Sequence, residues 1–225
     1  MSASDAGRTE DAGGVLGGRR SLGFALIVGG CVGVVAAILL IVIGGPRGPA
    51  DVQGLPPVPA DATWAAGARP APDFTLANQD GRAVSLSSLR GRVVLLTFLD
   101  SRCTHLCRLE GPLLGEVQRA LPEAERPLIV VVSVNTDDTA ASVRAAARTW
   151  GWRPDDWQWL MGDPEHLANV WEAYGVDVQR TPGDLLHTGA LYVIDRAGDE
   201  RAGYATPFDQ ERVTRLVDAL GGMPS

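Results

Sequence analysis

The chain has 225 residues, 45% of them hydrophobic, and a formal net charge of −7 at neutral pH. This length accommodates one ordinary folded domain with appended segments. From residue 71 onward there are 22 acidic and 15 basic residues, so the acidic surplus lies in the C-terminal part. Because a nucleic-acid-binding surface requires a concentration of basic side chains, the composition excludes nucleic acid as the expected partner.

The first expected element is a membrane anchor over residues 21–45, which carry no charged side chain. A helix of this length, at about 1.5 Å per residue, exceeds the roughly 30 Å hydrocarbon core of a bilayer. Most of the nearby positive charge precedes the segment, at Arg8, Arg19 and Arg20, with Arg47 after it. This distribution predicts a single-pass anchor in the cell membrane, with a cytoplasmic tail (1–20) and an extracytoplasmic C-terminal domain.

A cleaved signal peptide is the alternative interpretation of the same segment. Its apolar region would normally span about 7 to 15 residues and end at a small-residue cleavage site. The sequence VGGC at 28–31 resembles a lipoprotein cleavage box, but a further long apolar run follows Cys31. An uncleaved anchor is therefore the favoured interpretation, and whether Cys31 is lipidated stays open.

A proline-rich linker is expected between the anchor and the folded domain. Residues 46–70 contain six prolines and little periodicity. Such a composition is typical of a semi-rigid, partly polyproline spacer. It is predicted to hold the domain of residues 71–225 away from the membrane.

From residue 71 the pattern is that of a mixed α/β domain. Two short extended pieces come first, and continuous apolar runs then predict buried strands at 93–99 and 127–134. WQWLMG predicts a short strand, and the sequence from 188 to 205 predicts a hairpin. Apolar spacing and capping residues predict helices at 103–121, 137–152, 163–176 and 209–222. The order β-β-α-β-α-β-α-β-β-α indicates parallel strands at the centre of the sheet and a hairpin at its edge.

The stretch FLDSRCTHLCRLE contains two of the three cysteines, Cys103 and Cys107, separated by three residues. Cys103 is expected at the start of a helix, where the exposed N–H groups and the helix dipole lower the pKa of a thiol. Cys107 would then lie one turn further along, about 6 Å away on the same face. This spacing suits a disulfide and also suits two sulfurs that converge on one metal ion. Outside the membrane, reactive thiols or a disulfide are favoured over inert core cysteines.

A third side chain is needed to choose between redox chemistry and metal binding, and the chain has three histidines. His105 is expected to point to solvent, and His166 to lie on the exposed side of a helix. His187 precedes a strand, where a histidine is usually a loop residue or a satisfied core residue. From the residues alone, a disulfide, a nucleophile with its resolving partner and a metal pair all remain open.

Together these segments resemble the Sco/SenC family of membrane-anchored, thioredoxin-fold copper proteins. The resemblance covers roughly residues 71 to 220 and is carried by PDFTL, DGRAVSLSSLRGRVVLLTF, CxxxC, SVNTDDT, GDPEHLANVWEAYGV and LLHTGALYVIDRAGD. It implies a thioredoxin-like α/β fold and a copper ion bound by Cys103, Cys107 and His187. It also implies a role in delivering copper to, or reducing the cysteines of, the binuclear copper site in subunit II of cytochrome c oxidase.

The ligand set implied by the resemblance suits copper chemically. Thiolates favour Cu(I), and an added imidazole makes Cu(II) tolerable, so one copper ion could be held in both states. Three ligands leave a position open for a partner's ligand, whereas a structural zinc site would need a fourth, such as His105 or a carboxylate. The alternative function is a thiol–disulfide oxidoreductase or peroxide-reducing enzyme that uses Cys103 and Cys107.

Three residues distinguish the chain from related patterns. Thioredoxin-type oxidoreductases have proline before the strand that faces the active site, where this chain has Gly189; this favours a metal site. The Sco/SenC family commonly has proline after the second cysteine and aspartate before the histidine. This chain has Arg108 and Leu186 there. Arg108 adds positive charge near Cys107, which favours the thiolate.

Overall fold

The computed structural model describes residues 62–181 and 184–222. The expected cytoplasmic tail, the anchor at 21–45 and most of the proline-rich linker lie outside the described residues. Within the described residues, no helix is long and apolar enough to span a membrane.

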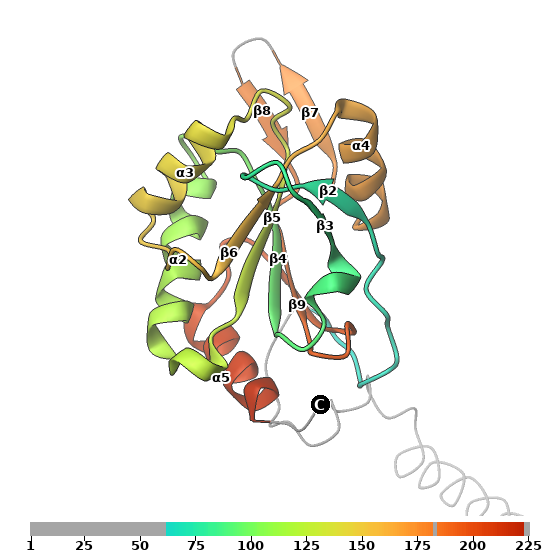
Figure 1. Ribbon diagram of the computed structural model, residues 1–225, viewed down its shortest axis with the longest axis vertical. Coiled ribbons are helices and arrows are strands. Elements are labelled where there is room, and N and C mark those ends of the chain that lie inside the picture. Colours follow the sequence, from blue (N-terminus) through green and yellow to red (C-terminus); the bar gives the residue numbers. More distant parts are fainter. Residues whose placement is uncertain (1–61, 182–183, 223–225) are drawn as a thin grey trace, which may run out of the picture. The chain divides into compact units, whose positions relative to one another are not determined.

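A six-stranded mixed sheet forms the centre of the domain, in the order β1-β10-β9-β4-β5-β6 (Figure 1). Its strands are β1 (Ala62–Thr63), β4 (Val94–Leu99), β5 (Leu128–Ser133), β6 (Trp157–Leu160), β9 (Ala190–Ile194) and β10 (Glu200–Ala205). β4, β5 and β6 run parallel, whereas β9, β10 and β1 are each antiparallel to their neighbours. The expected mixture of parallel strands and a hairpin in one sheet is confirmed, and the fold is thioredoxin-like. The expected positions differ: the parallel strands extend to the edge at β6, and the β9–β10 hairpin is interior because β1 pairs with β10 and forms the other edge.

Both faces of the sheet are covered. α2 (Cys107–Ala120), α3 (Ala140–Thr149) and α5 (Gln210–Gly221) share one apolar core with the sheet. The other core contains α4 (Pro164–Ala173), β2 (Thr75–Ala77) and the short helix η1 (Leu86–Leu89). β2 pairs with β3 (Ala83–Ser85), and a second short helix, η2, covers Glu123–Glu125. Because successive side chains of a strand point to opposite faces, Leu95 and Leu99 enter the first core and Leu96 and Phe98 the second. This double burial explains the continuous apolar runs of the central strands.

Helix starts follow the capping residues. Thr139 forms a capping box with Ser142 at the start of α3. The Asp163 side chain accepts from the N–H groups of Glu165 and His166, and Pro164 occupies the first turn of α4. The expected start of α4 is therefore confirmed.

A second hairpin was not expected from the sequence. β7 (Val178–Thr181) pairs with β8 (Asp184–His187), with Val178 opposite His187. The hairpin is drawn at the top of Figure 1, beyond the ends of β4, β5 and β6. His187 is therefore the last residue of a strand, and a short connection leads from it into β9.

The last residues of the expected linker already belong to the sheet. Ala62 and Thr63 pair with β10, and the Trp64 ring lies over Gly203. The guanidinium of Arg69 lies 4.4 Å from the centre of the Trp64 ring. Trp64 therefore packs against the folded domain, and its ring forms a cation–π contact with Arg69.

Candidate metal centre

Cys103 lies in a turn between β4 and α2. The helix begins at Cys107, with Leu106 at its N-cap, so the expectation that both cysteines share one helix face is wrong. The reason is Asp100: its carboxylate accepts from the N–H of Arg102 at 2.9 Å, and its carbonyl accepts from the N–H of Cys103 at 3.2 Å. These hydrogen bonds hold the chain in a turn, so the helix begins only at Cys107.

Further polar contacts hold this turn against β5 and α3. The Asn135 amide donates to the Asp100 carboxylate at 3.0 Å. The hydroxyls of Ser101 and Ser133 both contact the Asp138 carboxyl. Burial raises the pKa of Asp138, and these hydroxyls oppose that rise. The turn is therefore fixed by a network, which gives Cys103 a defined position.

The two free thiols have very different surroundings. Cys107 is fully buried, whereas Cys103 is partly exposed. A hydrogen bond from the Cys107 thiol, aided by the backbone N–H groups of His105 and Cys107, lowers the pKa of Cys103 to about 6. The same thiol–thiol hydrogen bond, followed by burial, raises the pKa of Cys107. Near neutral pH, Cys103 is thus a thiolate beside a protonated Cys107.

His187 lies against Cys107 although 80 residues separate them. Its Nε2 is 3.6 Å from Sγ of Cys107, and its Nδ1 is 3.0 Å from the carbonyl oxygen of Thr188. A carbonyl can only accept, so Nδ1 donates to it, and Nε2 is the ring nitrogen that faces the sulfur. Fixing the second ring nitrogen in this way is how proteins orient a histidine that ligates a metal.

Gly189 lets β9 approach close to the segment after β10. A Cβ added to Gly189 would lie 1.8 Å from Oγ1 of Thr206 and 3.0 Å from Cδ2 of Leu106. Such distances are far below van der Waals contact, so any side chain at this position would force its neighbours to move. Glycine therefore stands at this position because of a close approach, two residues after His187.

The donor set fits a soft metal ion better than a hard one. Two sulfurs and one imidazole are the ligand types that copper prefers. The structure brings Cys107 to Cys103 on one side and to His187 on the other. Across the described part of the chain, no three cysteine, histidine, aspartate or glutamate side chains converge as a ready-made metal cage. The three-ligand site at Cys103, Cys107 and His187 therefore stays a prediction.

The other two histidines are placed as expected from the sequence. His105 is exposed in the turn between the cysteines. His166 is exposed and forms a 2.5 Å ion pair with Asp163, which raises the pKa of the imidazole.

Glu110 is a buried carboxyl near the cysteines that was missed from the sequence. It lies on α2 close to one turn beyond Cys107, and it is 1% exposed. Burial raises its pKa to about 8. The Thr97 hydroxyl is 2.5 Å from this carboxyl and 3.0 Å from the carbonyl oxygen of Ala190. Because the hydroxyl has one proton, a protonated Glu110 can donate to Thr97 while Thr97 donates to Ala190.

This chain of hydrogen bonds joins the elements that carry the ligands. Glu110 is on the same helix as Cys107, and Ala190 begins the strand that follows His187. The sequence did contain a signal for the burial of Glu110. Residues three or four positions apart lie on the same face of a helix, so Glu110 shares a face with Cys107, three residues before it, and with Leu114, four residues after it. Leu109, although apolar and on the same helix, is 60% exposed.

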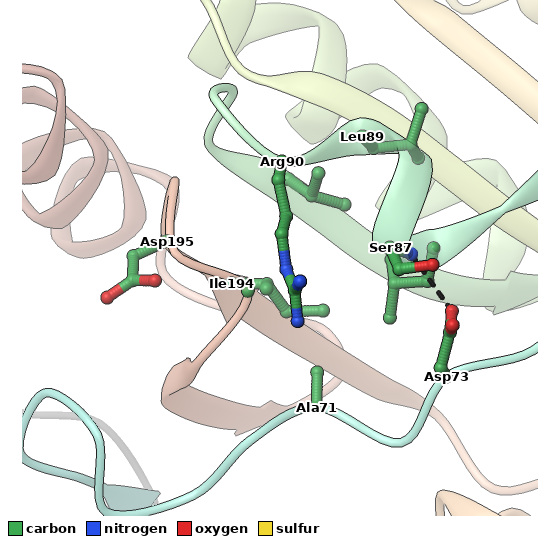
Figure 2. A pocket seen from close by; sticks show the side chains of 10 residues that line it. Ala71, Asp73, Ser87, Leu89, Arg90, Ile194 and Asp195 are labelled. Carbon is green, nitrogen blue, oxygen red and sulfur yellow. Dashed lines mark hydrogen bonds between the residues drawn. The ribbon is translucent and has the colours of Figure 1, made fainter. Parts of the chain in front are cut away.

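Two hollows deserve comparison as ligand sites. One is an open groove of about 330 Å³ between α3 and the turn that carries Cys103. The other is about 30 Å³ and lies near Asp73, Arg90 and Asp195 (Figure 2). In Figure 2 the Asp73 carboxylate accepts from the N–H of Ser87, at 2.9 Å. A water needs about 10–15 Å³ of such volume, so the second hollow has room for two or three waters and for no larger ligand.

Comparison with known proteins relates this site to one family. The family model described as SCO1/SenC matches residues 64–220. A SCO1 protein homolog of Bacillus subtilis is 26% identical over 147 residues, which cover 60% of this chain and 76% of that protein.

Solved structures give the same relationship. ScoI of Bradyrhizobium japonicum, solved with copper bound, is 26% identical, with a TM-score of 0.59 and coverage of 67% of this chain and 98% of that one. BsSco, described as a member of the Sco family of cytochrome c oxidase assembly proteins with a disulfide switch, is 23% identical. Its TM-score is 0.57, with coverage of 69% of this chain and 95% of that one.

Proposed function

Because the chain belongs to the SCO1/SenC family, whose model matches residues 64–220, we propose that it binds one copper ion through Cys103, Cys107 and His187. The observation that carries this proposal is the 3.6 Å contact between Sγ of Cys107 and Nε2 of His187. The hydrogen bond from Nδ1 to Thr188 keeps Nε2 free to act as a ligand. The copper-bound ScoI of Bradyrhizobium japonicum supports the choice of metal.

The arrangement suits transfer of the metal better than permanent storage. Cys103 is partly exposed on the rim of an open groove, whereas Cys107 is buried. An incoming ligand can therefore reach one sulfur while the other two donors remain in place. A three-ligand site also leaves a coordination position open.

The proposed physiological role is assembly of a copper protein. The recipient would be the binuclear copper site in subunit II of cytochrome c oxidase, or the site of another copper protein. The domain would work outside the cytoplasm, tethered to the membrane by residues 21–45. The family description of BsSco as an oxidase assembly protein is consistent with this role.

Reduction of a partner's disulfide is the second candidate function, and the low pKa of Cys103 favours it. The Cys103 thiolate would attack the disulfide, form a mixed disulfide and release one partner thiolate. Cys107, once deprotonated, would attack Cys103, close the Cys103–Cys107 disulfide and release the second. The partner gains two electrons, and this chain is left oxidised.

A titration of the reduced full-length protein with Cu(I), against a competing chelator, tests the copper proposal. We expect one copper per chain, and loss of high-affinity binding in Cys103→Ser and in Cys107→Ser. Equal copper affinity in wild type and both variants would contradict the proposal. Repeated turnover of a protein disulfide in metal-free buffer with a reductant supplied, together with weak copper binding, would instead establish the second function.

A further inference from the structure

The groove beside Cys103 is built from two elements and has an aromatic floor. Its lining includes Cys103 and Arg108 on one side, and Ala145 and Trp150 on the other. Trp150 is held in place by Gly111, where an added Cβ would lie 2.2 Å from the indole ring. Trp150 also stacks on Trp159, with ring centres 5.8 Å apart. The floor is therefore fixed before any ligand arrives.

The groove is positively charged although the domain is acidic. Arg102 and Arg108 line it, and no aspartate or glutamate does, so their two positive charges exceed the single negative charge of the Cys103 thiolate. This contrasts with 22 acidic and 15 basic residues from residue 71 onward. Arg102 donates to the carbonyl oxygen of Asp137. Within residues 62–181 and 184–222, the exposed Arg108 side chain has neither an ion-pair nor a hydrogen-bond partner.

The surroundings favour a protein as the occupant of the groove. The described residues include two exposed large apolar side chains, Leu109 at 60% and Leu186 at 54%. Leu109 follows Arg108 on α2, and Leu186 precedes His187 on β8. Exposed apolar side chains on the elements that carry Arg108 and His187 are typical of a surface that contacts another protein.

We propose that the groove lined by Arg102, Cys103 and Arg108 docks an acidic segment of the protein that exchanges copper or electrons with Cys103. This inference rests on the proposed function, because it takes Cys103 as the point of exchange. The guanidinium of Arg108 would pair with a carboxylate of the partner, which brings the partner's own ligand or thiol to Cys103. A volume of about 330 Å³ lies at the small end of ligand pockets, so a few residues of the segment would enter it.

Dye-labelled hexapeptides provide the probe. One has four aspartate or glutamate residues, one has asparagine and glutamine at those positions, and one has lysine. Binding to the reduced, metal-free full-length protein is measured by fluorescence anisotropy at two salt concentrations. We expect the acidic peptide to bind roughly tenfold more tightly than the neutral one at low salt, with the difference shrinking at high salt. The lysine peptide should bind most weakly.

Two variants test whether Arg108 is responsible for the preference for the acidic peptide. Arg108→Gln should lower the affinity for the acidic peptide about tenfold and leave that for the neutral peptide unchanged. Arg153→Gln is the matched control, because Arg153 is also exposed but precedes β6, at the opposite end of the parallel strands. Equal losses in both variants, or no preference for the acidic peptide, would overturn the proposal.

Free glutamate and a copper titration complete the test. If free glutamate displaces the peptide as effectively as the unlabelled peptide does, the groove binds small anions and the proposal is wrong. Copper titration of the same preparations distinguishes failure of the docking proposal from failure of the proposed copper binding. If the wild-type protein binds one copper but does not prefer the acidic peptide, the docking proposal alone is overturned. Absence of copper binding overturns the proposed function, whatever the peptide result.

Discussion

Nε2 of His187 lies 3.6 Å from Sγ of Cys107, so an imidazole at the end of one strand meets a thiol at the first turn of a helix 80 residues away. The His187 ring is oriented through Nδ1 by the Thr188 carbonyl, and Cys107 is linked to Cys103 by a thiol–thiol hydrogen bond. Cys107 thus contacts both His187 and the partly exposed Cys103. The copper proposal uses all three side chains, and disulfide reduction uses the two cysteines.

Cys103 should be the reactive thiol of the pair. Because its pKa is lowered to about 6 and it is partly exposed, iodoacetamide should alkylate it at least tenfold faster than the buried Cys107. Peptide-resolved mass spectrometry of the reduced protein at pH 7 measures both rates. Cys107→Ala removes the hydrogen-bond donor, so the midpoint of the Cys103 rate profile should move to higher pH. Cys107→Ser keeps a donor and should move it less; identical midpoints in all three proteins would contradict this.

Glu110 should make the folded state less stable as the pH rises. Burial raises its pKa from 4.5 to about 8. Between these values the folded protein keeps a proton that the unfolded chain has lost, so the free energy of unfolding falls with pH. The slope from this group is at most about 1.4 kcal/mol per pH unit.

Glu110→Gln cannot ionise and should lack this slope. In urea unfolding from pH 5 to 8.5, its stability relative to wild type should therefore rise with pH. Glu116→Gln, on the exposed side of the same helix, is the control and should run parallel to wild type. The prediction fails if the Glu110→Gln and wild-type curves are also parallel.

Gly189→Ala should damage both stability and the metal site. The new Cβ would lie 1.8 Å from Oγ1 of Thr206, and overpacking of this kind costs about 1–3 kcal/mol. The strain falls two residues from His187, so Cu(II) affinity should fall at least tenfold as well. Gly222→Ala is the control, because its Cβ would meet one atom, at 3.8 Å. If Gly189→Ala is less stable but binds copper with wild-type affinity, the position of His187 does not depend on the close approach of Gly189 to Thr206, and this prediction is wrong.

The buried strands β4 and β5 could be predicted because their signals are local. Continuous apolar runs predicted β4 and β5 to within one residue at each end, since both faces of these strands are buried. The Asp163–Pro164 pair predicted the start of α4 for a similar reason, because capping depends on adjacent residues.

The start of α2, the site contact of His187 and the β7–β8 hairpin were not predicted from spacing, each for a different reason. The start of α2 was misplaced because Asp100 accepts hydrogen bonds from the N–H groups of Arg102 and Cys103, which favour a turn over four further helical residues. The contact of Cys107 with His187 has no local signature at all; the resemblance to a family, not the spacing, singled out His187. The β7–β8 hairpin did have a signal, the Pro182–Gly183 dipeptide that follows VQRT, which is typical of a turn.

The most direct test of the account is the coordination of Cu(II) in wild type, His187→Ala and His166→Ala. Electron paramagnetic resonance and X-ray absorption report the number of nitrogen and sulfur ligands. We expect two sulfurs and one imidazole nitrogen in wild type and in His166→Ala, whose altered side chain lies on the surface beside Asp163. In His187→Ala the imidazole signal should vanish, and Cu(II) affinity should fall more than Cu(I) affinity. An unchanged Cu(II) spectrum and affinity in His187→Ala would contradict the central claim.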